Sequence, residues 1–337
     1  MTTREKTEKK RNAILRILRE SGEILSSSKL TQQLRALGHD VSGRTVRLYL
    51  TEFDREGLTQ NHGKRGRRIT PRGAKELAAA QVYEKVGFMA AKIDQLTYRM
   101  TFDLARREGT VIVNVSLLPV DRLADSIPLI KKVFTAGYAM GRLIALFPAG
   151  ARAGELTVPD GHVGIGTVCS VTLNGVLLAH GIPTTSRFGG LLEIQNKQAR
   201  RFVELIAYEG TTIDPLEIFI RTGMTDYVGA TGSGTGRIGA GFRELPADSR
   251  QQVLEIATRL EKVGLGGFWS IGWPGQPLME IPVSEGRLGA VVIGGLNPIA
   301  LLEECGIRTT SRALSHLVEY GDLFPFTDLD RRVRNLL

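Results

Sequence analysis

The sequence predicts an α+β protein in which an N-terminal winged helix-turn-helix precedes a larger, internally duplicated α/β domain. Residues 1–80 contain 18 Lys and Arg against 9 Asp and Glu, whereas residues 81–337 contain 26 of each, so the formal charge of +9 lies in the first part of the chain. In addition, one heptapeptide recurs 125 residues later. We expect domains at 1–80 and 81–326 and a C-terminal tail at 327–337.

Three helices are predicted in the basic segment. Apolar residues at helical spacing predict a first helix from Lys6 to Leu18. A second helix would be capped by Ser27 or Ser28 and would end at Gly38, because glycine favours a left-handed stop. After a short turn, Ser42 can cap a third helix. The buried face of this helix would consist of Val46, Leu50 and Phe53.

The third helix has the pattern of a recognition helix. The N-terminal turns of such a helix enter the major groove of DNA, where an Arg can bond guanine through two hydrogen bonds. The outward-facing polar residues of those turns are therefore our candidates for contacts with base edges. They are Arg44, Thr45 and Arg47.

Residues 58–70 predict a short hairpin with a cationic turn, which suits a wing lying along the phosphate backbone of double-stranded DNA. The expected phosphate contacts are Lys64, Arg65, Arg67 and Arg68. A further helix would follow at 72–80, with Thr70 as its cap. The alternative is a winged helix that binds another protein and whose basic surface is only solvated.

Composition excludes several classes of protein. No apolar segment fits a secretory signal, and the longest uncharged stretch, 161–186, is too polar and too rich in glycine to span a membrane. Cys169 and Cys305 form no Cys-x-x-Cys motif, and the five His are scattered. We therefore expect a cytoplasmic protein that contacts no membrane, binds no metal and keeps its cysteines reduced.

The duplication is the second informative feature. The segment Gly181-Ile-Pro-Thr-Thr-Ser-Arg187 recurs as Gly306-Ile-Arg-Thr-Thr-Ser-Arg312, with six of seven positions identical. The repeats span roughly 90–200 and 215–325, and weaker matches extend through both. Two such copies are expected to pack as a pseudo-twofold domain with a cleft at their junction, where ligands often bind.

Alternating or apolar runs predict strands in both copies, at 92–102, 109–118, 143–147, 162–168, 239–245, 266–271 and 287–293. Helical spacing predicts helices at 121–138, 196–208 and 246–262. The first two strands would form a hairpin, and the helix at 196–208 would lie between the copies.

The repeated Thr-Thr-Ser-Arg is the best signal for a small-molecule site, because hydroxyl groups beside a guanidinium can bind a carboxylate or a phosphate. The candidate effector contacts are Thr184, Thr185, Ser186, Arg187, Thr309, Thr310, Ser311 and Arg312. The alternative is structural: each copy would cap a helix, with its Arg paired to an acidic neighbour such as Glu193 or Glu319. The residues alone leave both interpretations open.

Enzyme signatures are missing. Residues 234–239 match G-x-G-x-x-G formally, but the residues that follow are extended in character, so a turned loop at 229–241 is favoured over a nucleotide site. No nucleophile elbow, His-Glu-x-x-His helix or Walker A sequence occurs, and we expect no catalytic residue and no cofactor. Two alternatives remain: a winged helix fused to an enzyme that uses Asp214, Asp226, His180 or Cys169, and a DNA scaffold without sequence preference.

The chain as a whole resembles the NrpR nitrogen-regulatory repressors of methanogenic archaea and some bacteria. The resemblance rests on the winged helix, on the segments 92–103, 231–239 and 294–298, and on the Thr-Thr-Ser-Arg pair, and it extends from about Glu5 to Phe326. It implies a repressor of nitrogen-assimilation genes whose regulatory domain senses 2-oxoglutarate. The familiar archaeal form has two regulatory domains, and this chain has one.

The proposed mode of action combines these observations. Two protomers of a homodimer would place their third helices in successive major grooves of a palindromic operator. A dicarboxylate bound in the regulatory domain would change the spacing of the two helices and release the DNA.

Overall fold

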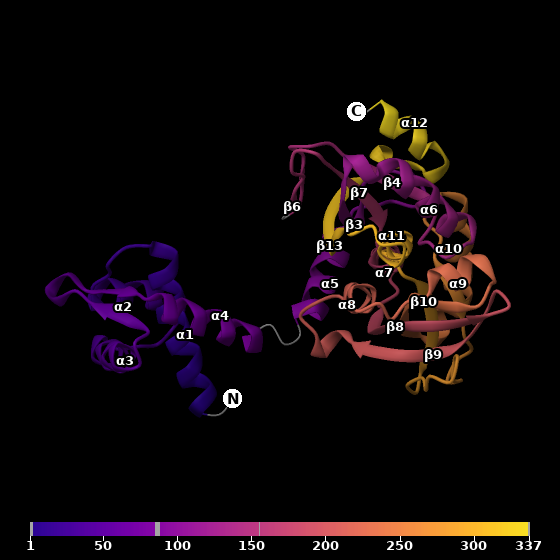
Figure 1. The fold of residues 1–337 in the computed structure, drawn as a ribbon. Coiled ribbons are helices and arrows are strands. Elements are labelled where there is room, and N and C mark those ends of the chain that lie inside the picture. Colours follow the sequence, from indigo (N-terminus) through magenta and orange to yellow (C-terminus); the bar gives the residue numbers. More distant parts are fainter. Residues whose placement is uncertain (1–2, 85–87, 155, 336–337) are drawn as a thin grey trace. The chain divides into compact units, whose positions relative to one another are not determined.

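The computed structural model describes residues 3–84, 88–154 and 156–335, and the chain divides into two compact units, Met1–Val86 and Gly87–Leu337 (Figure 1). The division lies beyond residue 80 because helix α4 (Pro71–Glu84) continues past the expected end of the winged helix. Among the described residues, no helix combines the length and the apolar character needed to cross a membrane.

The first unit is a winged helix. It consists of α1 (Thr3–Ser21), α2 (Ser27–Ala36), α3 (Gly43–Arg55), the antiparallel strands β1 (Thr59–Asn61) and β2 (Arg67–Ile69), and α4. Leu25 forms a further bridge to Arg67, and Gly66 beside it has φ +123°; a Cβ there would overlap the carbonyl group of Leu25, so only glycine fits. The order of helices and hairpin confirms the prediction. The core includes Ile14, Leu18, Leu30, Leu34, Val46, Leu50 and Phe53.

Side-chain caps fix where the helices begin. Ser42 Oγ accepts a hydrogen bond from Thr45 N at 3.1 Å, which confirms the predicted start of α3. The cap of α2 is Ser26, which accepts from Lys29 N at 3.4 Å, so the prediction of one of the two following serines was wrong by one position. Gly38 has φ +81°, as expected of a helix stop.

The described residues of the second unit form two antiparallel sheets of five strands. The first has the order β13-β3-β7-β4-β14 and the second β11-β12-β10-β8-β9 (Figure 1). The strands are β3 (Thr110–Pro119), β4 (Leu143–Phe147), β7 (His162–Val168), β8 (Thr185–Gln195), β9 (Gln198–Ala207), β10 (Gly236–Pro246), β11 (Phe268–Ile271), β12 (Arg287–Ile293), β13 (Thr310–Glu319) and β14 (Phe324–Pro325). A two-stranded ribbon is formed by β5 (Arg152–Ala153) and β6 (Leu156–Thr157).

The helices of this unit surround and separate the sheets. They are α5 (Phe88–Arg99), α6 (Leu123–Thr135), α7 (Val171–Ala179), α8 (Pro215–Arg221), α9 (Tyr227–Gly232), α10 (Arg250–Lys262), α11 (Asn297–Glu304) and α12 (Leu329–Arg334). The central helix α11 packs Ile299 and Leu302 into a cluster with the first sheet and Ala300 and Leu301 into a cluster with the second. Both faces of this helix are therefore buried (Figure 1).

The duplication of the sequence is a duplication of the fold. An offset of 125 residues superposes the bounds of β7 on those of β12, and it relates β3 to β10, α6 to α10, α7 to α11 and β8 to β13 within a few residues. The last strand of each copy is exchanged: β8 pairs with β10 of the second copy, and β13 pairs with β3 of the first. The predicted pseudo-twofold α+β domain is confirmed, and the Thr-Thr-Ser-Arg segments begin the two exchanged strands.

Two predicted elements have the wrong type. The segment 92–102 is not the first strand of a hairpin, because 92–99 belong to helix α5, which buries Met89, Ile93 and Leu96 at helical spacing. The segment 196–208 is not a helix. It contains a turn at Asn196 and Lys197, both with positive φ, followed by edge strand β9. Such a turn joins antiparallel strands, and the helical spacing of Phe202, Leu205 and Ile206, which suggested a helix, is accommodated on an edge strand.

Two further segments differ from the expectation. The residues 229–241 are not one loop: 229–232 end α9, 233–235 form a turn, and β10 starts at Gly236 as an extended strand and not as a helix. The expected tail at 327–337 includes α12, whose Leu329 and Val333 are buried against the first sheet and α6. The C-terminal segment up to residue 334 is thus part of the folded domain.

Candidate functional site

One candidate surface lies on the outward side of α3. Arg44 and Arg47 project from its first two turns and are exposed, whereas Thr45 is half-buried and its hydroxyl oxygen lies 2.8 Å from Ser42 Oγ. Leu48 is 59% exposed one turn after Arg44. Our sequence analysis missed Leu48, although its spacing from Arg44 was visible, and such an apolar side chain can contact a thymine methyl group.

The wing provides a second set of cations. Lys64, Arg65 and Arg68 are exposed, as a surface for a polyanion requires. Arg67 differs from them, because it is half-buried and its Nε donates to Asp54 Oδ2 of α3 at 3.1 Å. This ion pair connects the wing to α3 and partly neutralises the charge of Arg67.

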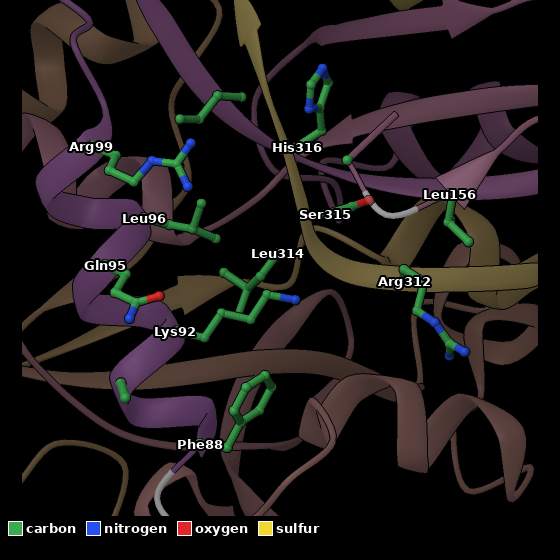
Figure 2. A pocket seen from close by; sticks show the side chains of 13 residues that line it. Phe88, Lys92, Gln95, Leu96, Arg99, Leu156, Arg312, Leu314, Ser315 and His316 are labelled. Atoms are coloured by element: carbon green, nitrogen blue, oxygen red, sulfur yellow. The ribbon is translucent and has the colours of Figure 1, made fainter. Parts of the chain in front are cut away.

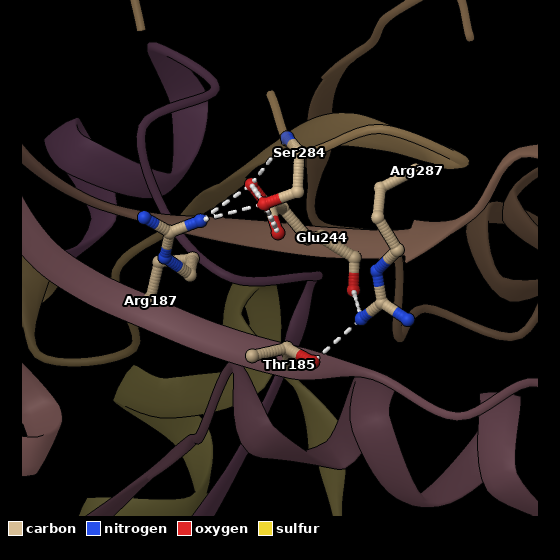
Figure 3. Close-up of polar contacts among 5 residues, drawn as sticks. All are labelled: Thr185, Arg187, Glu244, Ser284 and Arg287. Atoms are coloured by element: carbon tan, nitrogen blue, oxygen red, sulfur yellow. Dashed lines mark hydrogen bonds and ion pairs between the residues drawn. The ribbon is translucent and has the colours of Figure 1, made fainter. Parts of the chain in front are cut away.

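The first Thr-Thr-Ser-Arg segment lies at the start of β8 in a closed polar network (Figure 3). Arg187 Nη1 donates to Glu244 Oε1 at 2.5 Å, and Ser284 donates to the same carboxylate through its backbone N–H and its hydroxyl group. Arg287 Nη2 donates to Thr185 Oγ1 and to the backbone carbonyl of Glu244. The side chain of Glu244 is only 4% exposed, so Arg187 is the counter-ion of a buried carboxylate.

The other two side chains of this segment, those of Ser186 and Thr184, also face the protein interior: one is hydrogen-bonded and the other is buried. Ser186 Oγ accepts from Asn174 Nδ2 at 3.0 Å. Thr184 Oγ1 is buried without a hydrogen-bond partner among the described residues. Of the structural alternative, the helix cap is wrong, because the segment starts a strand. Arg187 does pair with an acidic residue, but this is Glu244 and not Glu193, which pairs with Arg201.

The second segment lies at the start of β13. Thr309 donates to Glu303 Oε1 through its backbone N–H and its hydroxyl group, at 2.5 and 2.7 Å. Ser311 Oγ lies 2.8 Å from Ser116 Oγ of the neighbouring strand β3, and Thr310 is exposed. This segment, like the first, starts a strand and not a helix.

Arg312 is held less tightly than Arg187. Its Nη1 lies 3.8 Å from Glu217 Oε2 of α8, whereas Arg221 lies 3.3 Å from the same oxygen. The other oxygen of this buried carboxylate accepts from Ala313 N. Glu319 is therefore not the partner of Arg312. Because Arg221 also lies beside Glu217, this carboxylate keeps a counter-ion when Arg312 moves to another anion. The loss of stability is therefore smaller than for the same movement of Arg187.

A cavity of about 790 Å³ opens beside Arg312, between α5 and β13 (Figure 2). Lys92, Gln95 and Arg99 of α5 line it, together with apolar side chains that include Leu314. The pairing of β13 with β3 is irregular between Arg312 and His316, and Leu314 within this bulge has φ +51°. The bulge turns the strand so that several consecutive side chains reach the cavity.

Sequence reasoning missed the α5 wall of this cavity because it treated the segment as a strand. Lys92, Gln95 and Arg99 recur at i, i+3 and i+7, which is the spacing of one helical face. This signal was present in the sequence. The Met89, Ile93 and Leu96 stripe, at i, i+4 and i+7, could have revealed the helix.

A buried polar cluster lies near the two exchanged strands. Arg243 is 1% exposed and donates to Asn174 and Ser170. Burial, with the neighbouring Glu217 adding to it, raises the pKa of Asp214 to about 6, although Asp214 also caps α8 by accepting from the backbone. These groups fill the interior between the copies and position α8.

The residues considered for catalysis do not form a catalytic group. Burial raises the pKa of the Cys169 thiol to about 12, so the thiolate nucleophile is not available at neutral pH. Asp226 caps α9, and His180 Nδ1 lies 2.8 Å from the carbonyl oxygen of Val176. In the described part of the chain, no cluster of three or more His, Cys, Asp or Glu could hold a metal ion. Cys169 is buried, whereas Cys305 is exposed.

Comparisons with known proteins agree with the architecture. Residues 12–77 match the model of the ribonuclease R winged-helix domain, and residues 86–324 match that of NrpR regulatory domains NRD1 and 2. The chain is similar to a crystal structure of a nitrogen repressor-like protein from Methanococcus jannaschii, with a TM-score of 0.60 and 27% identity. The match covers 70% of this chain and 97% of that one.

Two proteins similar to this chain are named global nitrogen regulators. NrpRI of Methanosarcina mazei is 35% identical over 313 residues, which cover 93% of this chain and 96% of that protein. NrpR of Methanococcus maripaludis is 27% identical over 310 residues, which cover 92% of this chain but 54% of that protein. The family is one of regulators and not of enzymes. The chain therefore belongs to the NrpR family of nitrogen-responsive transcriptional regulators.

Proposed function

We propose that this protein is a repressor of nitrogen-assimilation genes that binds double-stranded DNA and is released from it by 2-oxoglutarate. The observation that carries the proposal is the concentration of exposed cations on the winged helix of a chain whose remaining 257 residues are electrically balanced. A net charge confined to one small unit favours binding of a polyanion by that unit. Both steps would take place in the cytoplasm.

We assign the DNA contacts to predicted residues whose side chains are exposed on α3 and on the wing. Arg44 and Arg47 would read base edges in the major groove, and Thr45 would contribute through its position at the helix cap. On the wing, the exposed cations would bind phosphates, and Arg67 would hold the wing against α3. The phosphate contacts would be Lys64, Arg65 and Arg68.

The Thr-Thr-Ser-Arg residues would have two different roles. Thr184, Thr185, Ser186 and Arg187 would maintain the junction of β8 with the second sheet, because their polar atoms are engaged there or enclosed. Thr309, Thr310 and Ser311 would hold the start of β13. Arg312, which lines the cavity and shares its carboxylate partner, would contact the effector.

A homodimer is the proposed active form. Winged-helix regulators that read palindromic operators place one recognition helix of each protomer in successive major grooves. The match covers 96% of the length of the M. mazei relative.

The test is a titration of the full chain against its operator, selected from random DNA, at fixed salt and with random competitor. We expect tight binding to the operator that weakens when 2-oxoglutarate is added. Equal affinity for operator and competitor would indicate a nonspecific DNA scaffold and overturn the proposal. Tight operator binding that no 2-oxoglutarate concentration changes would remove this effector and leave the DNA-binding function.

Salt dependence tests the wing separately. Replacing Lys64 and Arg68 by Ala should lower the slope of log affinity against log salt by about two, because each lost phosphate contact contributes about 0.9 to it. Arg200→Ala, which removes an exposed cation of β9, is the matched control and should leave the slope unchanged. An unchanged slope in the wing variant would exclude the wing from the DNA interface.

A further inference from the structure

Leu48 is an apolar side chain within a cationic stripe on α3. It is 59% exposed and, among the side chains that the structure describes, it lies outside the hydrophobic core of the winged helix. The exposed residues on this side of the helix recur at i, i+3, i+4 and i+7, which is the spacing of one helical face. They are Arg44, Arg47, Leu48 and Thr51. A single exposed leucine is common in soluble proteins, so its place in this stripe, and not its exposure alone, requires an explanation.

The acidic side chains of α3 are paired with cations outside this stripe. Arg11 donates to Glu52 at 3.0 Å, and Arg67 of the wing donates to Asp54 at 3.1 Å. Neither arginine of the stripe forms an ion pair within the part of the chain that the structure describes. The stripe therefore presents positive charge, which favours a polyanion as its partner, with one apolar group beside the charges.

The apolar group fits one feature of the major groove of DNA. Phosphates do not explain a leucine in this place, because they are bound by charged and hydrogen-bonding groups. The C5-methyl group of thymine, in contrast, is apolar and projects into the major groove, where it marks the position of a thymine. Packing of Leu48 against this methyl group would remove the apolar surface of both from water.

The spacing along α3 indicates where such a thymine would lie relative to a guanine. Leu48 follows Arg44 by four residues, which corresponds to about 6 Å along the helix axis. Successive bases of one DNA strand are about 3.4 Å apart along the DNA axis. If Arg44 bonds a guanine through its two hydrogen bonds, the thymine read by Leu48 would therefore lie within about two base pairs of that guanine.

We infer that Leu48 is a specificity-determining residue that contacts the C5-methyl group of a thymine close to a guanine bound by Arg44 or Arg47. The inference rests on the proposed function, because it requires that α3 lies in the major groove of the operator. It goes beyond that function by assigning an apolar base contact and by naming a base that each half-site must contain. Since Leu48 has no charge, this contact increases specificity without increasing the salt dependence of binding.

The test removes the methyl group from the DNA and the apolar side chain from the protein. Each thymine of the selected operator is replaced in turn, at equivalent positions of both half-sites, by 2′-deoxyuridine, which pairs with adenine but lacks the methyl group. At fixed salt, the wild-type full chain should bind one of the substituted operators more weakly by about fourfold for each half-site, because one apolar carbon is no longer buried. Leu48→Ala should bind the thymine and the deoxyuridine forms of that operator with the same affinity.

Matched variants separate the base contact from general effects. Leu37→Ala removes the same type of side chain at the end of α2, where it is 63% exposed, and should retain the wild-type sensitivity to deoxyuridine. Leu48→Met keeps an apolar side chain of similar volume and should retain most of that sensitivity. Leu48→Ala should leave the slope of log affinity against log salt unchanged, because no phosphate contact is lost. Alanine is favourable in a helix, and circular dichroism melting of each variant checks that the fold is retained.

Each outcome bears on the inference. Wild-type binding that no deoxyuridine substitution weakens would overturn the contact and leave the DNA-binding function intact, as would a selected half-site without thymine near guanine. A loss at one position that persists in Leu48→Ala would assign the methyl group to another side chain and overturn the inference. Equally weaker binding of every operator form by Leu48→Ala, with the wild-type sensitivity retained, would indicate a contact with another protein chain and also overturn it. Equal wild-type affinity for operator and random competitor would overturn the proposed function, and this inference with it.

Discussion

The two Thr-Thr-Ser-Arg strands have the same sequence and equivalent positions, but their arginines have different surroundings. In β8, Arg187 lies 2.5 Å from a buried carboxylate that also binds Ser284 (Figure 3). In β13, Arg312 lies 3.8 Å from a buried carboxylate that another arginine approaches more closely, and it borders a cavity (Figure 2). A duplicated motif can thus maintain the structure in one copy while the other copy remains available for a ligand.

The difference arises from what each strand packs against and not from the motif. Glu244, the partner of Arg187, belongs to β10, the strand beside β8, so the two side chains meet across the sheet. Glu217, the partner of Arg312, belongs to α8, at the start of the second copy. In addition, the bulge in β13 opens the strand toward α5, at the start of the first copy. The offset of 125 residues places α5 over α8 and Lys92 over Glu217, so the two copies differ here in side chains and not in the elements themselves.

The carboxylates of α8 provide the strongest test of this asymmetry. Burial raises the pKa of Asp214 from its ordinary 3.8 to about 6, so between pH 4 and 6 the folded state holds more protons than the unfolded state. The stability that Asp214 contributes at low pH is therefore lost as the pH rises through 6. Asp214→Asn keeps an oxygen that can accept from Leu216 N and removes the charge. We expect it to be more stable than wild type at pH 7.5 by up to about 3 kcal/mol.

Urea unfolding of both proteins at pH 4 and pH 7.5 measures this effect. The difference between variant and wild type should shrink toward zero at the lower pH, where Asp214 is protonated in the folded state. Asp248→Asn, which changes an exposed carboxylate, is the control. A difference that is independent of pH would contradict the assignment of the titration to Asp214.

Removing the two arginines compares the strands directly. Arg187→Ala leaves Glu244 buried without its cation and should lower the free energy of unfolding by about 2 kcal/mol, less than for a fully buried pair because Arg187 is 44% exposed. Arg312→Ala should cost less than about 1 kcal/mol, because Arg221 remains beside Glu217. Urea unfolding at pH 7.5 measures both. Equal losses would mean that the two strands do not differ as their contacts indicate.

The smallest expected effect concerns Ser284. Its hydroxyl donates to Glu244 while its backbone N–H donates to the same carboxylate, so Ser284→Ala removes one of these bonds and keeps the other. We expect a loss of about 1 kcal/mol in the free energy of unfolding. The double variant with Arg187→Ala should show coupling, since both side chains bind one carboxylate. Strictly additive losses would argue against a shared network.

The local sequence was sufficient for elements whose signals are short-range. Ser42 and its apolar stripe predicted α3, and the bounds of β4, β7 and β12 match the predicted strands. The local sequence was insufficient where strand alternation and helical spacing both fit the same short segment. Residues 92–102 alternate well enough to suggest a strand, and Phe202, Leu205 and Ile206 have helical spacing although they lie on an edge strand. In both cases the packing partner decides which period is used.

The amino-acid sequence alone determined that the chain has a basic winged helix and a neutral body made of two related copies, because charge and repetition are properties of the chain itself. Only tertiary structure decided that the last strand of each copy is exchanged, since strand pairing joins residues far apart in sequence. It also decided that Arg187 meets Glu244 while Arg312 meets a cavity lined by Lys92 and Arg99. The same four residues acquire different surroundings because the side chains around the two strands differ between the copies.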